Sequence, residues 1–142
     1  MGLFDAFNKS NKVRLTTPFI FVASMIYMST VDGHLDESEV MPILNLLGTG
    51  HAPIVLGRQA ILYSQRTPVA QFIQEAGAQL DANQKACILA NMLDVLFGDG
   101  YADHAERQLF EQFCTGWGVD ESVSGPLIRA AVTKNNRSII LG

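Results

Sequence analysis

Two short acidic turns contain the residues of this 142-residue chain that are best suited to do chemistry. In both VDGHLDESEV and GDGYADHAER, an aspartate precedes a glycine, a second aspartate follows four residues after the first, and a glutamate comes three residues later. The matched residues are Asp32, Asp36 and Glu39 in the first turn and Asp99, Asp103 and Glu106 in the second. Carboxylate oxygens are the ligands that calcium and magnesium prefer. Each turn therefore has the side chains of a divalent-cation site.

A second interpretation of the same turns needs no ion. The second aspartate of each turn is well placed to cap the following helix, because a short carboxylate can accept a hydrogen bond from a free amide of the first turn. The glutamate completes a capping box, and the helix dipole favours its charge there. The first aspartate fits less easily, because it stands at the end of a helix, where the dipole disfavours an anion. The turns also differ from an EF-hand, whose glycine is sixth.

The elements that must position these turns are helices. Apolar residues recur at helical spacing, and glycine, proline and aspartate mark the ends of each run. Thr17 is expected to cap the first helix, and Asp81 and Gln84 form a capping box before the fifth. The predicted helices cover residues 17–31, 36–47, 51–65, 67–77, 81–100, 103–116 and 120–135. The predicted fold class is all-α: a single helical-bundle domain over residues 1–142 with about seven helices, on which the amphipathic residues 1–10 pack.

Each acidic turn lies between an apolar helix and an amphipathic helix, so the turns belong to a repeated helix–DG–helix unit. The first copy covers about residues 17–47 and the second about residues 82–115, and matched acidic residues are 67 positions apart (99 − 32). Internal repetition at one spacing is typical of a duplicated structural unit. We therefore expect the two copies to be related by pseudo-symmetry.

This repeated pattern resembles the TerB-like family, which includes tellurite-resistance proteins and the first domain of some membrane-bound DnaJ-type co-chaperones. The resemblance covers most of the chain, from the first predicted helix to the last. It implies an all-helical domain with internal pseudo-symmetry and divalent metal at the six acidic residues of the two turns. It also implies a role in stress response and protein partners in membrane-associated complexes.

Charge and hydropathy exclude several kinds of partner. The net charge is −4 and the ten basic residues are scattered, so no nucleic acid is expected as a ligand. The apolar run at residues 18–31 is shorter than the roughly 20 residues that a membrane-spanning helix needs. We therefore predict a cytoplasmic protein without a transmembrane segment. In that compartment Cys87 and Cys114, which lie in apolar helical contexts, are expected to be buried, reduced thiols.

No pattern typical of catalysis accompanies the turns. The serines lack a G-x-S-x-G context. His34 and His104 occupy different positions in the two turns and are expected at the surface, so a hydrolase using His104 would lack a nucleophile–base pair. We predict a non-enzymatic tellurite-resistance or stress-associated TerB-like module that binds calcium or magnesium at its acidic turns. The alternative is a metal-free helical protein-interaction domain, in which the turns are only caps and the binding surface lies near Trp117 or residues 1–10.

Overall fold

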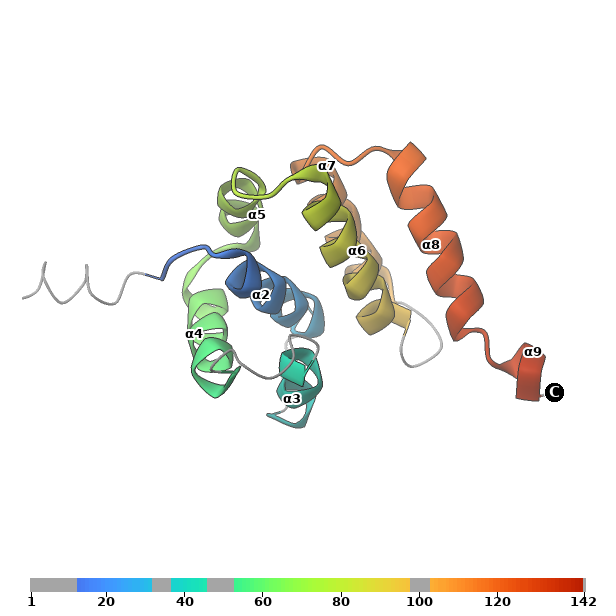
Figure 1. Cartoon of the computed structure of the whole chain (residues 1–142), viewed down its shortest axis with the longest axis horizontal. Coiled ribbons are helices and arrows are strands. Elements are labelled where there is room, and N and C mark those ends of the chain that lie inside the picture. Colours follow the sequence, from blue (N-terminus) through green and yellow to red (C-terminus); the bar gives the residue numbers. More distant parts are fainter. Residues whose placement is uncertain (1–12, 32–36, 46–52, 98–102, 142) are drawn as a thin grey trace, which may run out of the picture.

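The computed structural model describes residues 13–31, 37–45, 53–97 and 103–141, and the regular secondary structure in these ranges is entirely helical (Figure 1). Seven helices follow one another, and one further helical turn ends the described chain. They are α2 (Thr17–Ser29), α3 (Glu37–Asn45), α4 (Pro53–Arg66), α5 (Val69–Gly77), α6 (Ala82–Phe97), α7 (His104–Gly116), α8 (Glu121–Asn135) and the turn α9 (Ser138–Leu141). The predicted all-α fold is confirmed. The expected docking of residues 1–10 lies outside the described residues.

The central helix is α2, which packs against α3, α4, α6 and α7. Ten of its consecutive residues are buried, as expected for a helix that is apolar on all sides. Pro18 lies in its first turn, and Thr16 Oγ1 accepts the backbone N–H of Phe19 at 3.3 Å. The cap is therefore Thr16, and the prediction of Thr17 is wrong. Thr17 already belongs to the helix, and its hydroxyl accepts a hydrogen bond from the Gln84 side chain at 3.5 Å.

Aromatic side chains connect four helices through the core. Phe19 of α2 meets Tyr63 of α4 with ring centroids 5.4 Å apart, and Tyr63 meets Phe72 of α5 at 5.7 Å. Phe72 contacts Phe113 of α7 at 6.2 Å, and Phe113 contacts Trp117 at 5.1 Å. All four pairs are edge-to-face, the geometry that the charge distribution of the rings favours. One continuous aromatic cluster thus joins the start of α2 to the end of α7.

Trp117 closes the bundle where α5 and α7 end. It is 3% exposed, and its indole Nε1 donates a hydrogen bond to the carbonyl of Ile73 at 2.9 Å. Gly77, the last residue of α5, permits this approach, because a Cβ there would lie 2.8 Å from Trp117 Cδ1. The chain then turns at Gly118, whose φ of 68° is a left-handed conformation that favours glycine. Trp117 therefore covers the helix ends and is itself buried, whereas the alternative prediction of a binding surface near this residue stays a prediction.

The second half of the chain is organised around α6. This helix packs on α2, α7 and α8, whereas α8 packs on α6 rather than on α7. An ion pair between Lys134 Nζ and Asp94 Oδ2, at 2.8 Å, also joins α8 to α6. In Figure 1, α8 and α9 form the edge of the molecule opposite α4. None of the described helices combines the length and hydropathy that crossing a membrane requires.

Candidate functional site

Most of the two acidic turns lies outside the described residues. This holds for Asp32, Asp36 and Asp99, and for the side chain of Glu39, whose backbone belongs to α3. The helices on either side of each turn are present, but the clustering of three carboxylates and the pseudo-symmetry of the repeats stay predictions. Among the side chains that the structure does place, no group of three histidines, cysteines or carboxylates could hold a metal ion.

Asp103 and Glu106 are the two predicted site residues with described side chains. Asp103 Oδ1 accepts the backbone N–H of Glu106 at 2.8 Å, and the Asp103 carbonyl accepts the N–H of Arg107 at 3.1 Å. The Asp103 backbone is extended, with φ −76° and ψ 172°. This residue therefore stands just outside α7 and satisfies an amide that a helix start leaves free. Its role as a cap is confirmed, and the adjacent His104 is exposed, as predicted.

Two other aspartates begin helices in the same way. Asp81 Oδ1 accepts the N–H of Gln84 at 2.8 Å, and Gln84 Oε1 accepts the N–H of Asp81 at 2.9 Å, which confirms the predicted capping box. Asp120 accepts hydrogen bonds from the hydroxyl and the backbone N–H of Ser122. These bonds, that of the hydroxyl first, hold the pKa of Asp120 below its usual value. Each described aspartate that directly precedes a helix thus caps that helix.

A groove of about 900 Å³ lies between α6, α7 and α8. Here α8 packs mainly on α6. Leu93, Leu96 and Phe97 of α6 form the floor, Phe110 lines the α7 side and Ile128 lines the α8 side. Leu93, Leu96 and Phe110 are buried, whereas Phe97 and Ile128 are partly exposed, so these two apolar side chains remain accessible to an incoming molecule.

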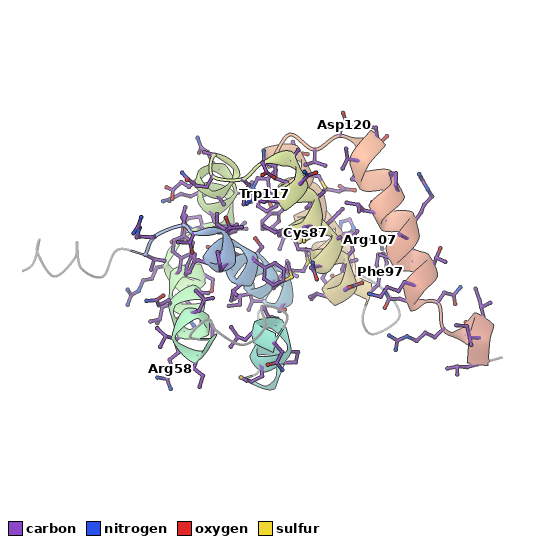
Figure 2. All side chains as sticks on the ribbon, viewed as in Figure 1. Arg58, Cys87, Phe97, Arg107, Trp117 and Asp120 are labelled. Carbon is purple, nitrogen blue, oxygen red and sulfur yellow. The ribbon has the colours of Figure 1, made fainter. Side chains whose placement is uncertain are left out.

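Charged side chains surround this apolar floor. They are Arg107 and Glu111 on α7, Asp120 just before α8, and Glu121 and Arg129 on α8. All five are exposed, and none forms an ion pair with another described residue. In Figure 2, Arg107 and Phe97 lie between α6 and α8, and Asp120 lies at the start of α8. The rim thus presents both signs of charge, which can orient a bound molecule.

The two cysteines differ in burial. Cys114 lines the groove and is 9% exposed. Desolvation, and then the negative charge of Glu111, raise the pKa of its thiol from 9.0 to about 11, so the reactive thiolate does not form at neutral pH. Cys87 is exposed, and the prediction that it is buried is wrong. The apolar stripe of α6 begins at Ile88 and Leu89 and turns Cys87 to the opposite side of the helix.

The groove was not predicted from the sequence. Its floor residues have the helical spacing of ordinary core positions, and spacing does not report which neighbour covers them. One signal was present in α8, where Gly125 lines the groove and carries no side chain to fill it.

Comparison with known proteins adds no relative to this description. No family model matches the chain, and no match is found among the curated proteins or the solved structures.

Proposed function

We propose that this chain is a non-catalytic TerB-like module, associated with tellurite resistance or another stress response, that binds a partner protein in the groove between α6, α7 and α8. The groove is the observation that carries the proposal, because it combines the partly exposed apolar side chains of Phe97 and Ile128 with exposed charges. An apolar centre within a polar rim is typical of protein-recognition surfaces. The TerB-like part of the proposal is supported by the repeated acidic turns.

An amphipathic helix of the partner suits this groove best. Helices form both walls and the floor, so an incoming helix can bury its apolar face against Phe97 and Ile128. Burying a leucine or phenylalanine side chain contributes roughly 1.5–3 kcal/mol. An exposed ion pair at the rim contributes less than about 1 kcal/mol. We therefore expect affinity to come from the floor and orientation to come from Arg107 and Arg129.

Site-specific photo-crosslinking in the native cells tests the groove. A photoreactive amino acid replaces Glu121 or Arg129 at the rim, and a matched control replaces Gln74 on the exposed side of α5. We expect a covalent adduct with a discrete protein from the two groove positions only. Adding Ile128→Asp, which places a charge on the apolar wall, should abolish that adduct. Equal adducts from Gln74, or an adduct that survives Ile128→Asp, would contradict the proposal.

A divalent cation at each acidic turn is the second part of the proposal. Three carboxylates recur at one spacing in both turns. The first aspartate of each turn follows an apolar helix, where the helix dipole disfavours an uncompensated anion. Capping does not compete with this role, because a carboxylate that gives one oxygen to an amide keeps a second oxygen for an ion. The cation would stabilise the turn and fix the angle between the two helices that it joins.

A further inference from the structure

The outward side of α4 presents apolar and cationic side chains together. Ile54, Val55 and Leu62 are 58%, 55% and 49% exposed, and Arg58 and Arg66 are exposed as well. At 3.6 residues per turn, these five positions fall within roughly a third of the helix circumference. The rest of the helix packs on α2 and α3. We call these five residues the α4 outer face.

The stretch of sequence that contains this face carries a charge opposite in sign to that of the rest of the chain. Between residues 40 and 74 the charged side chains are Arg58 and Arg66 alone, so this stretch carries +2. The remaining residues therefore carry −6, because the whole chain carries −4 (−4 − 2 = −6). All 14 acidic residues lie outside this stretch. Cationic charge and exposed apolar side chains thus coincide on one helix of an acidic protein.

We propose that the α4 outer face binds the surface of a lipid bilayer containing anionic headgroups, with α4 parallel to the bilayer plane. Arginine side chains are attracted to anionic headgroups, and isoleucine and leucine side chains can enter the boundary between headgroups and acyl chains. Arg58 points away from the bundle (Figure 2), and its aliphatic stem can follow the apolar side chains while its guanidinium stays at the headgroups. This proposal does not depend on the groove, because α4 and α8 lie at opposite edges of the molecule (Figure 1).

The same side chains are less suited to a protein partner. Protein interfaces are usually anchored by tryptophan, tyrosine or a buried arginine. The α4 outer face has no aromatic side chain, and both of its arginines are exposed. The apolar turn α9 is a weaker candidate for lipid binding, because Arg137 is the one basic residue directly beside Ile139, Ile140 and Leu141. Arg137 is used instead in the control variant described below.

Co-sedimentation with vesicles tests the proposal. The full chain is mixed at low ionic strength with vesicles of phosphatidylcholine alone or of phosphatidylcholine with phosphatidylglycerol. We expect binding to the anionic vesicles only, weakened by added salt. Arg58→Gln/Arg66→Gln should lower the partition coefficient roughly 30-fold, from about fivefold for each arginine. Ile54→Ser/Leu62→Ser should also lower it, because the apolar contribution is lost.

A matched control removes the same net charge elsewhere. Lys85→Gln/Arg137→Gln neutralises two basic residues on α6 and before α9, and this variant should bind as the wild type does. Circular dichroism checks that every variant is folded. The proposal is overturned if the wild-type chain ignores anionic vesicles, or if the control pair reduces binding as much as the α4 pair. It is also overturned if the serine variant binds unchanged, since binding would then be only a charge effect.

Discussion

The acidic turns combine the observed helix cap at Asp103 with the proposed cation, so substitutions can separate the two roles. Asp103→Ala removes the bond to the Glu106 amide and should lower the free energy of unfolding by about 0.5–2 kcal/mol even in metal-free buffer. Asp32→Ala/Asp99→Ala should instead abolish the response to calcium, magnesium, manganese or zinc. In the wild type, an ion at 100 times its dissociation constant should add about 2.7 kcal/mol. Thermal unfolding of metal-stripped protein, with and without each ion, measures both effects.

The control for this pair of substitutions is Asp81→Ala, which removes a capping aspartate outside the turns. It should lower stability and leave the cation response intact. If no ion raises the stability of the wild type, the cation sites are refuted and the turns are helix caps. If Asp103→Ala matches the wild type in metal-free buffer, the cap contributes nothing to the stability of α7.

Single residues could be predicted from sequence when their contacts are local. The Asp81–Gln84 box and the Asp103 cap depend on residues three positions apart, and that spacing is visible in the chain. Cys87 could not be placed in this way, because its exposure depends on how α6 is rotated against its neighbours. For the same reason the burial of Trp117 could not be predicted: its bond to Ile73 joins residues 44 positions apart.

At the scale of elements, replacing either of two helical glycines by alanine should change the stability of the protein in opposite directions. Gly77→Ala places a Cβ 2.8 Å from Trp117 Cδ1, and the indole cannot retreat without losing its bond to Ile73. Such overpacking costs about 1–3 kcal/mol, more than alanine gains over glycine at a helix end. In Gly125→Ala, the added Cβ would lie 3.4 Å from the guanidinium of Arg129, a side chain that is exposed and flexible. This substitution should therefore stabilise α8 by about 0.5–1 kcal/mol. Thermal unfolding of the two variants measures the difference.

The fluorescence of Trp117 provides an independent readout, because this is the single tryptophan of the chain. It should change in Gly77→Ala and stay constant in Gly125→Ala. A Gly77→Ala protein with wild-type stability and emission would contradict the packing of α5 against α7.

The helices themselves could be predicted from periodicity. The close approach of Gly77 to Trp117 and the groove beside α8 could not, because both depend on which helix faces which.

At the scale of the whole molecule, three buried or partly buried side chains that keep their protons in the folded state make the free energy of unfolding depend on pH in the alkaline range. Burial raises the pKa of Tyr27, Tyr63 and Cys114, and neighbouring negative charge raises it further. The folded chain therefore holds these protons more tightly than the unfolded chain. The stability that they contribute is complete below the unfolded pKa values of 9.0 for cysteine and 10.0 for tyrosine, and it is lost as the pH rises. For Cys114 the loss runs from pH 9 to about 11 and is on the order of 2 kcal/mol.

Urea unfolding at successive pH values from 8 to 11 measures this decline. Cys114→Ala should flatten the curve between pH 9 and 11, because the titrating thiol is gone. Tyr27→Phe should lower stability near pH 8 by roughly 0.5–1.5 kcal/mol, since the Tyr27 hydroxyl donates a hydrogen bond to the Thr67 carbonyl at 2.6 Å. Its curve should then approach that of the wild type as the pH rises above 10, because the phenylalanine has no proton to lose. Curves that stay parallel would show that Tyr27 keeps an ordinary pKa in the folded bundle and that burial of its ring does not link stability to pH.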